Sequence, residues 1–247
     1  MPWYQKWFGA PYYRILYQHR DLDEAFRIVD NLMPHLQAGE HSRMLDIACG
    51  EGRFSRRLAH YGHDVTGIDI APEMVASAWK FENENLRFFI RDMRTPLFIN
   101  YFDFAFNFFT SFGYFEKQED NQLAAHSIAA SLKPGGVLVM DYFNAEFVLS
   151  HLVPSEQITR QDLLFDIRRS YQHNHIIKDI YITDNSGMSH SFQERVPVFS
   201  LDDFRQMFGA AGMEIVTTFG DYELDAYHRS NSPRMIMLFR KEHGKSH

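Results

Sequence analysis

The sequence has few of the features of a crosslinked, nucleic-acid-binding or membrane protein. Its 247 residues include a single cysteine, Cys49, which excludes an intramolecular disulfide and indicates a reducing compartment. The 25 Lys and Arg are outnumbered by 32 Asp and Glu, so the basic excess that supplies most nucleic-acid affinity is missing. No apolar run approaches the roughly 18 residues of a membrane span, and the first residues show no signal-peptide pattern. These absences predict a cytoplasmic protein without nucleic-acid or membrane partners.

What the sequence does contain is a strand, a glycine turn and a helix in immediate succession. A short apolar run, Met44 to Ala48, leads into Gly50-Glu51-Gly52, and an amphipathic stretch begins at Arg53. Glycine permits a positive φ and a close approach of the backbone, and the first N–H groups of a helix attract a negative group. The segment predicts a ligand site, although a plain β-turn would use the same glycines. Its candidate residues are Asp46, Ala48, Gly50 and Gly52.

The next predicted strand, His63 to Ile68, indicates the kind of ligand. It ends at Asp69, which lies 23 positions after Asp46. In a doubly wound sheet, an acidic residue at this spacing sits at the tip of the second strand, where its carboxylate accepts the hydroxyls of a ribose. A dinucleotide-binding turn would have a third glycine where this chain has Ser55. A nucleoside ligand other than a dinucleotide is therefore predicted.

Four segments in order resemble the motifs of the class I S-adenosylmethionine-dependent methyltransferases. The segments are Asp46-Ile-Ala-Cys-Gly50-Glu-Gly52, Gly67-Ile-Asp69, Arg91-Asp92-Met93 and Leu132-Lys-Pro-Gly-Gly136, and the resemblance covers residues 40 to 145. It implies that S-adenosylmethionine is the cofactor and S-adenosylhomocysteine the product. It also implies that Asp92 binds the adenine amino group while Met93 contacts the ring. Ile70, Met74 and Phe108 are assigned to the same cofactor site.

The predicted fold is α/β, with a Rossmann-like, doubly wound, seven-stranded sheet in a single methyltransferase domain over residues 1–247. The last strand is expected to run antiparallel, because its linker is too short for a crossover helix. The remaining predicted strands are Leu86 to Ile90, Tyr101 to Phe109, Val137 to Phe143, Met213 to Phe219 and Arg234 to Arg240. The predicted helices are Asp21 to His35, Pro72 to Phe81, Asp120 to Leu132 and Leu201 to Ala211.

Two segments extend this fold. Residues 1–38 are expected to form a helical cap, whose aromatic side chains either pack on a sheet or cover the ligand. Residues 145–199 are expected to form a β-rich insertion over the active-site side, with strands Leu163 to Tyr171, His175 to Thr183 and Met188 to Val198 and a hairpin at Asp184 to Gly187. This insertion either covers the substrate pocket or forms a homodimer surface. Its histidines lack the spacing of a metal site, so no metal is expected.

The carboxyl end of the Tyr101 to Phe109 strand is predicted to be the reacting edge, because ligands of open α/β sheets bind outside the strand ends. Asn107 is assigned to cofactor binding. Tyr13, Asn107 and Tyr114 are assigned to catalysis. Methyltransferases of exocyclic base amines have Pro-Pro and an aromatic after this Asn, whereas this chain has Phe-Phe-Thr, which argues against a DNA base. The candidate substrate contacts are Tyr17, Tyr142, Asn144, Tyr227, His228 and Arg229.

Phe109-Thr-Ser-Phe-Gly-Tyr114 is similar to a subgroup of small-molecule N-methyltransferases that includes enzymes acting on amino sugars. The resemblance implies methyl transfer by in-line displacement to a small-molecule acceptor, with an amine slightly favoured over oxygen. Two alternatives remain at this stage. One is a nicotinamide-dependent enzyme on a similar sheet, and the other is a non-catalytic protein that binds S-adenosylmethionine or serves as a scaffold.

Overall fold

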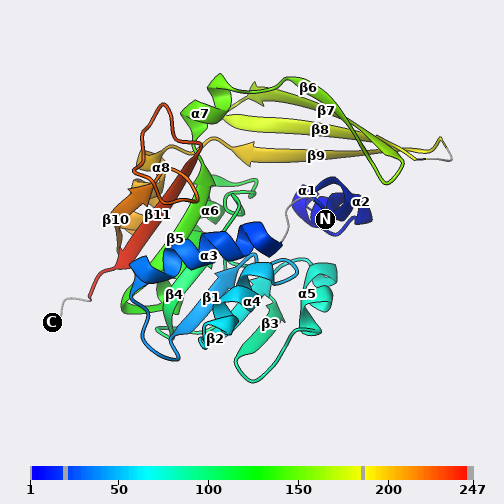
Figure 1. The fold of residues 1–247 in the computed structure, drawn as a ribbon. Coiled ribbons are helices and arrows are strands. Elements are labelled where there is room, and N and C mark those ends of the chain that lie inside the picture. The colour runs from blue at the N-terminus through cyan, green and yellow to red at the C-terminus, as the bar shows by residue number, and fades with distance from the viewer. Residues whose placement is uncertain (1, 19–21, 185–186, 244–247) are drawn as a thin grey trace.

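The computed structural model describes residues 2–18, 22–184 and 187–243. Figure 1 shows a central sheet flanked by helices, and a second sheet that extends to one side. The helices are α1 (Trp3–Phe8), α2 (Pro11–Leu16), α3 (Leu22–Leu36), α4 (Arg53–His60), α5 (Pro72–Trp79), α6 (Gln118–Ser131), α7 (Ala145–Ser150) and α8 (Leu201–Ala210). The predicted start of α3, Asp21, lies outside the described residues.

The central sheet has seven strands in the order β10-β11-β5-β4-β1-β2-β3. Its strands are β1 (Arg43–Ile47), β2 (Asp64–Asp69), β3 (Leu86–Ile90), β4 (Phe102–Asn107), β5 (Leu132–Phe143), β10 (Met213–Phe219) and β11 (Arg234–Lys241). The first five pair in parallel, whereas β11 runs antiparallel to both β5 and β10. The predicted fold class is confirmed. Strand order reverses between β1 and β4, which is where a ligand site is expected in such a sheet.

Apolar side chains cover both faces of this sheet. On one face, α3, α4 and α5 contribute Ile28, Leu58 and Val75 to a buried cluster with β1, β2 and β4. On the other face, α6 and α8 bury Ile128 and Phe204 against β5 and β11. The two layers of helices fix the carboxyl ends of the parallel strands at one edge, and that edge is where the turns after β1, β2, β3 and β4 meet.

The fifth strand begins earlier than the sequence predicts. The predicted turn, Leu132 to Gly136, lies inside β5, whose first residue pairs with Phe102. The register then shifts between Phe102 and Phe104, and Gly135 adopts a φ of +78°. The turn residues are therefore absorbed as an irregularity in a longer strand, which glycine permits at a positive φ.

The insertion forms a sheet of four antiparallel strands, not the predicted three. These are β6 (Ser155–Arg160), β7 (Leu163–Gln172), β8 (His175–Thr183) and β9 (Ser189–Pro197). The unpredicted strand β6 reads Ser-Glu-Gln-Ile-Thr-Arg and pairs only with β7 at the edge of the sheet. An edge strand with one apolar side chain gives no clear alternation in sequence. The hairpin predicted at Asp184 to Gly187 includes residues outside the described ranges.

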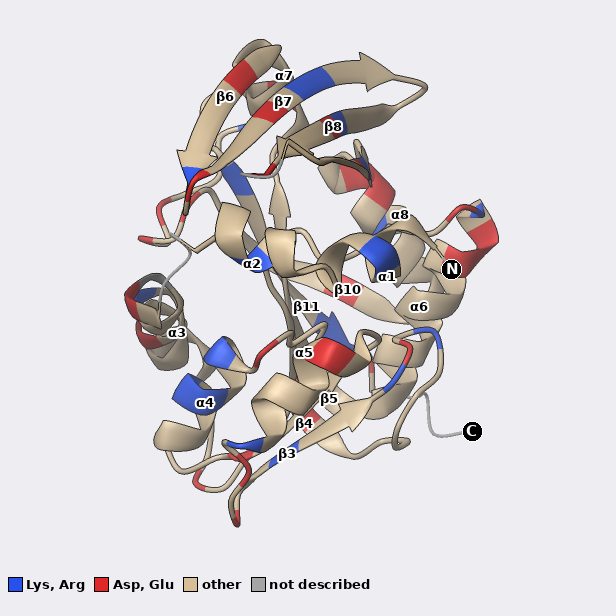
Figure 2. Ribbon diagram, turned by 90° about the vertical axis from the view of Figure 1, so that its right-hand side faces the viewer, with Lys and Arg blue, Asp and Glu red and all other residues tan. Residues whose placement is uncertain are grey.

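The N-terminal helices α1 and α2 lie between the insertion sheet and the central domain, as Figure 2 shows from a second direction. Trp7 and Leu16 pack with Phe165, Ile180 and other buried side chains of the insertion. We call residues 2–18 the cap. Of the two predicted roles for its aromatic side chains, packing on a sheet is therefore observed. No helix in the described part of the chain is long and apolar enough to cross a membrane.

Candidate active site

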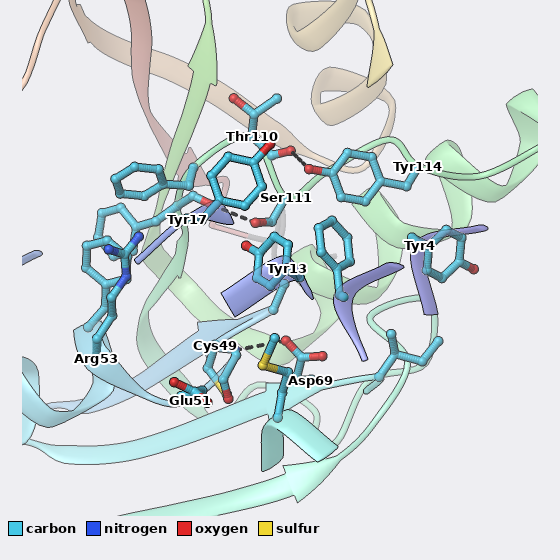
Figure 3. Close-up of a pocket in the computed structure, with 18 of the residues that line it drawn as sticks. Tyr4, Tyr13, Tyr17, Cys49, Glu51, Arg53, Asp69, Thr110, Ser111 and Tyr114 are labelled. Carbon is cyan, nitrogen blue, oxygen red and sulfur yellow. Dashed lines mark hydrogen bonds between the residues drawn. The ribbon is translucent and has the colours of Figure 1, made fainter. Parts of the chain in front are cut away.

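A cavity of about 960 Å³ opens at the carboxyl edge of the central sheet, beneath the cap and the insertion. Its volume lies near the upper end of the range usual for ligand sites. Its walls come from the turns after β1, β2, β3 and β4, from the cap, and from β7, β8 and β9. Figure 3 shows Tyr17 and Tyr114 on the side of this cavity opposite Cys49 and Asp69. The cavity therefore joins the predicted cofactor turn to the predicted reacting edge.

The glycine turn after β1 places its two glycines in different surroundings. Ala48, Gly50 and Gly52 adopt φ values of +57°, +57° and +78°. A Cβ on Gly52 would lie 2.5 Å from the Phe88 ring, whereas nothing lies within 4 Å of a Cβ on Gly50. Gly50 and Ala48 line the cavity, and Gly52 does not. The predicted cofactor role of Gly52 is therefore corrected to one of packing behind the turn.

Asp69 connects the turn after β1 to the turn after β2. Its Oδ2 accepts a hydrogen bond from the Gly50 N–H at 2.8 Å, and its Oδ1 accepts one from the Ala71 N–H at 2.8 Å. Burial raises the pKa of this carboxyl, while the backbone donors oppose that effect. The carboxylate lines the cavity and each oxygen retains a second lone pair. The position suits the acceptance of two vicinal hydroxyl groups.

Asp46 lies deeper and depends on one side-chain donor. It is 1% exposed, and the Ser55 hydroxyl donates to its Oδ2 at 2.5 Å. Burial raises the pKa of Asp46 to about 7, because a hydroxyl stabilises the charge less than water does. Ser55, which the sequence offers in place of a third glycine, thus hydrogen-bonds an acidic group in the cavity floor.

Asp92 lines the cavity after β3 but is already held by an arginine that the sequence analysis did not select. Arg94 donates to Asp92 Oδ2 through Nη2 at 2.6 Å and also through Nε, and it donates to Asp120 through Nη1 at 2.9 Å. Burial raises the Asp92 pKa, but the hydrogen bonds from Arg94 outweigh it and the net pKa is lowered. Asp92 therefore stays ionised. Four other predicted cofactor residues also line the cavity: Ile70, Met74, Met93 and Phe108.

The segment after β4 has a strained backbone. Phe109 and Thr110 both adopt positive φ, +58° and +60°. Positive φ is uncommon for residues other than glycine and rarer still for a β-branched residue such as Thr110. Asp141 holds this conformation: its Oδ2 accepts from the Phe109 N–H at 2.8 Å, and its backbone carbonyl accepts from the Thr110 N–H at 3.0 Å. Arg234 donates to Asp141 Oδ1 at 2.6 Å and to the Thr110 hydroxyl at 3.2 Å. Thr110 and Arg234 line the cavity, so the strain shapes its wall.

Tyr13, Tyr17 and Tyr114, which the sequence predicts to contact the acceptor or take part in catalysis, all line the cavity. The Tyr114 hydroxyl donates to the Thr110 carbonyl at 2.5 Å, and the Tyr13 and Tyr17 rings are 5.0 Å apart between centroids. Trp3 packs edge-on against the Tyr114 ring at 5.1 Å. Residues of the cap thus also line the cavity, and the second predicted role, covering the ligand, stays a prediction.

Asn107 does not reach the cavity. It is fully buried, its Nδ2 donates to the Ile47 carbonyl at 3.0 Å, and it is absent from the residues that line the cavity. Its Oδ1 has no hydrogen-bond partner among the described residues. The assignment of Asn107 to the cofactor and to catalysis is therefore corrected: the side chain turns into the sheet and ties β4 to β1.

Five predicted substrate contacts also require correction, because they lie outside the cavity lining. The Tyr142 hydroxyl donates to the Pro197 carbonyl in the core, and the Asn144 amide donates to the carbonyls of Arg229 and Ser232. The Arg229 guanidinium is paired with Glu146, on the exposed surface. Tyr227 packs on the core beside α7, and His228 is exposed. The loop after β10 folds back on α7 and does not extend over the cavity.

The insertion contributes wall residues that the sequence analysis did not select. Arg169, Ile176, Lys178, Glu194 and Val196 line the cavity from β7, β8 and β9. Alternation along these strands shows in the sequence which residues share a face, but not which face meets the cavity. In the described part of the chain, no group of three or more His, Cys, Asp and Glu side chains could hold a metal ion.

Comparison with known proteins identifies the family. A family described as "Methyltransferase domain" matches residues 17–218. YqeM of Bacillus subtilis, a methyltransferase by its description, is 31% identical over 156 residues, which is 62% of this chain and 61% of that protein. The dTDP-3-amino-3,4,6-trideoxy-alpha-D-glucopyranose N,N-dimethyltransferase of Streptomyces venezuelae is 26% identical, over 83% of this chain and 90% of that protein.

The fold is also found in solved structures. An S-adenosylmethionine-dependent methyltransferase from Clostridium acetobutylicum superposes with a TM-score of 0.77 at 15% identity, covering 94% of this chain and 96% of the other. At this identity the similarity establishes the shared fold and not a shared acceptor.

Proposed function

This chain belongs to the methyltransferase-domain family and is an S-adenosylmethionine-dependent methyltransferase, and we propose that its acceptor is a small molecule that is methylated on an amine nitrogen. The observation that carries the proposal is the enclosure of the site. The acceptor side of the cavity lies under the cap and the insertion, with Tyr13, Tyr17 and Tyr114 in its walls. Such a covered site suits a small acceptor better than a polymer.

The residues present fit the cofactor. We propose that Asp69 accepts the ribose hydroxyls, that Asp92 and Met93 contact the adenine, and that Gly50 and Asp46 contact the methionine end; all five line the cavity, which supports these roles. The bound sulfonium supplies an already activated methyl group. The protein therefore has to hold the acceptor in line with the breaking bond and to keep water away. The aromatic walls serve both purposes.

The absence of a histidine favours an amine over an alcohol. No histidine occurs among the described residues that line the cavity, and Tyr17 and Tyr114 lie opposite Asp69 together with Thr110 and Ser111. Glu194 of the insertion wall already accepts hydrogen bonds from Tyr17 and Trp7. An alcohol has to lose its proton to a base as it reacts, whereas an amine can lose its proton to solvent beforehand. A tyrosine, with a reference pKa of about 10, orients an amine by hydrogen bonding more readily than it removes a proton. The sugar N,N-dimethyltransferase among the relatives supports the same acceptor atom.

The test is an acceptor assay with S-adenosylmethionine in which products are identified by mass spectrometry. Small amines are compared with alcohols of the same carbon skeleton. We expect the mass of at least one amine to increase by one methyl group, which is attached to nitrogen, and the masses of the alcohols to stay unchanged. Preferential methylation of the alcohols would contradict the proposal.

A Tyr114→Phe variant should lose turnover while keeping its affinity for S-adenosylhomocysteine, because its hydroxyl belongs to the acceptor side. Cofactor binding with no methylated product from either class of compound would support the alternative of a non-catalytic cofactor-binding protein.

A further inference from the structure

The inward faces of β7, β8 and β9 are largely apolar, and their polar positions include His190, which contacts the Tyr12 hydroxyl, and one charged row. On β8 this face reads Ile176, Lys178, Ile180 and Ile182, and its isoleucines are buried. Lys178 lies directly opposite Arg169 of β7 and directly opposite Glu194 of β9. Side chains at opposite positions have Cβ atoms roughly 5 Å apart and point to the same face. The row therefore crosses three strands, and all three of its side chains line the cavity.

The cap fixes one end of this row. The Lys178 ammonium donates to the Tyr17 hydroxyl at 2.5 Å, and that hydroxyl donates to Glu194 Oε1 at 2.7 Å. The Trp7 indole N–H donates to the same oxygen at 2.7 Å. These contacts hold Glu194 and Lys178 in fixed orientations, with side chains only 15% and 11% exposed. The row is a preorganised part of the wall.

Arg169 occupies the other end and retains hydrogen-bonding capacity. Its Nη2 donates to Glu156 of β6, and its Nη1 donates to the Val153 carbonyl at 3.4 Å. A guanidinium has five N–H donors, so Arg169 has donors left that no described residue accepts. Glu156 does not line the cavity, whereas Arg169 does. Arg169 therefore presents positive charge to the cavity, whereas its carboxylate partner, Glu156, is not part of the cavity lining.

The charge of the cavity wall differs from that of the chain. Eight Lys and Arg and six Asp and Glu line the cavity, whereas acidic residues are in excess over the whole chain. Three of the six acidic residues, Asp46, Asp69 and Asp92, belong to the cofactor side. Several of the basic residues belong to the same side, among them Arg53 and Arg56 of α4 and Arg91 after β3. The insertion contributes Arg169, Lys178 and Glu194, so its part of the wall has an excess of one positive charge, and positive charge concentrates anionic ligands. Figure 2 shows the basic positions on β7 and β8 in blue.

Two cations directly opposite each other on one face repel each other, and here each is paired with one carboxylate, Arg169 with Glu156 and Lys178 with Glu194 at 3.8 Å. We infer that Arg169, with Lys178 beside it, is the subsite for an anionic group of the methyl acceptor, either a carboxylate or a phosphate. The inference rests on the proposed function and narrows its acceptor to an amine that also carries a negative charge. A guanidinium binds either anion through paired N–H donors.

The test titrates the full-length protein, with and without S-adenosylhomocysteine, with inorganic phosphate and with acetate as probes of the two anion types. Three variants separate the possible roles of Arg169. Arg169→Gln removes the cation, and Glu156→Gln removes its partner but leaves the cation in place. Arg168→Gln changes the neighbouring exposed arginine, which is paired with Asp166 and does not line the cavity.

We expect saturable binding of at least one probe by the wild type, weakened roughly ten- to a hundredfold in Arg169→Gln, the equivalent of one charge-assisted hydrogen bond. Glu156→Gln should bind the probe as well as the wild type or more tightly, and Arg168→Gln should be unchanged. The probe that binds identifies carboxylate or phosphate as the group. No saturable binding by the wild type, or equal losses in Arg169→Gln and Glu156→Gln, would overturn the inference and leave Arg169 as a structural tie between β6 and β7.

Acceptor pairs give a second readout through turnover. Glycine is compared with glycinamide, and glucosamine 6-phosphate with glucosamine, so that each pair differs in its anionic group. The anionic member should have the higher kcat/KM, and Arg169→Gln should raise its KM with little change in kcat. Equal or better methylation of the neutral members would contradict the anionic subsite while leaving the proposed amine methylation intact. Unchanged S-adenosylhomocysteine affinity in all variants shows that the cofactor site is unaffected.

Discussion

At the scale of single residues, the two carboxylates of the cofactor floor differ in what surrounds them. Asp69 accepts two backbone N–H groups, whereas Asp46 accepts the Ser55 hydroxyl and lies almost wholly out of solvent. Burial raises the pKa of both carboxyls; hydrogen bonds from the Ser55 hydroxyl and backbone oppose it at Asp46, and backbone N–H groups oppose it at Asp69. Asp46 is therefore the acidic group of the site that is expected to change its protonation near neutral pH.

This environment predicts a pH-dependent stability in the absence of cofactor. Because the pKa of Asp46 in the folded protein, about 7, lies above its ordinary value of 3.8, the stability it contributes is fully present below pH 3.8 and is lost as the pH rises through about 7. The free energy of unfolding of the wild type should fall relative to Asp46→Asn by about 2–3 kcal/mol between pH 5 and 8. Urea unfolding of both proteins at several pH values measures this difference. Parallel pH profiles would contradict it.

The two turn glycines predict opposite phenotypes for the same substitution. Gly52→Ala places a Cβ against the Phe88 ring, so it should destabilise the fold by about 2 kcal/mol or more. Gly50→Ala meets open space and faces the cavity, so it should cost about 1 kcal/mol in stability and mainly weaken cofactor binding. Thermal unfolding and S-adenosylhomocysteine titration of both variants separate the effects. Equal loss of stability in the two variants would argue against this division of roles.

At the scale of elements, the segment after β4 depends on β5 and β11 for its conformation. Asp141 of β5 is fully buried, and its contacts with Arg234 and with the Phe109 N–H hold the strained turn. Burial lowers the Arg234 pKa, but the nearby Asp141 charge outweighs burial and the net pKa is raised. The ion pair thus connects the antiparallel end of the sheet to the wall of the cavity.

Removing one member of this pair should be far more damaging than removing a neighbouring hydrogen bond. Asp141→Asn leaves Arg234 buried without its counter-charge and should destabilise the protein by about 3–5 kcal/mol. Tyr222→Phe is the matched control, because it removes the 3.1 Å hydrogen bond from Tyr222 to the same carboxylate and leaves the Asp141–Arg234 ion pair in place, at a cost of about 1 kcal/mol. Urea unfolding at pH 7 gives both values. A loss of about 1 kcal/mol or less in Asp141→Asn would show that the pair does not hold the turn.

Elements with a strong local pattern could be predicted from the sequence, and those that depend on distant partners could not. The turn from β1 to α4 is specified by adjacent residues and forms as expected. The start of α8 is also local, because Ser200 and Asp203 form a capping box there. The edge strand β6 has one apolar side chain and depends on pairing with β7. The start of β5 depends on pairing with Phe102 across the sheet. Neither partner is visible in local sequence.

The candidate site likewise contains some residues that could be predicted from the sequence and others that depend on distant segments of the chain. Asp46 was selected with the glycine turn, Asp69 because it ends a predicted strand, and Asp92 because the family resemblance implies it. All three line the cavity, since the ends of parallel strands meet at one edge of the sheet. Asn107 also follows this rule but turns toward β1. Arg169, Lys178 and Arg234 reach the cavity from segments far along the chain. Their positions depend on the docking of the insertion and of β11, which no local pattern specifies.

At the scale of the whole molecule, the central sheet provides the cofactor floor, and the cap and insertion provide the acceptor walls. The two additions are joined to each other by Trp7, Tyr17 and Glu194. Cofactor binding and acceptor selection are thus assigned to different parts of the chain. Substitutions in the insertion are therefore expected to alter acceptor turnover more than cofactor affinity.

Self-association through the insertion stays a prediction. Its outward face exposes Leu164 and Tyr181 at 40% and 45%, which leaves apolar area for a second copy to cover. Light scattering during size-exclusion chromatography should give twice the mass of one chain, and Leu164→Asp with Tyr181→Asp should return the mass of one chain. A wild type with the mass of one chain at micromolar concentration would contradict a dimer.

The most direct test of the assigned cofactor site is calorimetric titration with S-adenosylhomocysteine. The variants are Asp69→Ala, at the carboxyl end of β2, and Asp64→Ala as a control at its opposite end, away from the cavity. We expect micromolar binding, about −8 kcal/mol, by the wild type and by Asp64→Ala. Asp69→Ala should lose about 2–5 kcal/mol of that affinity while remaining folded. Absence of binding by a folded wild type, or unchanged affinity in Asp69→Ala, would contradict the assignment of this cavity to S-adenosylmethionine.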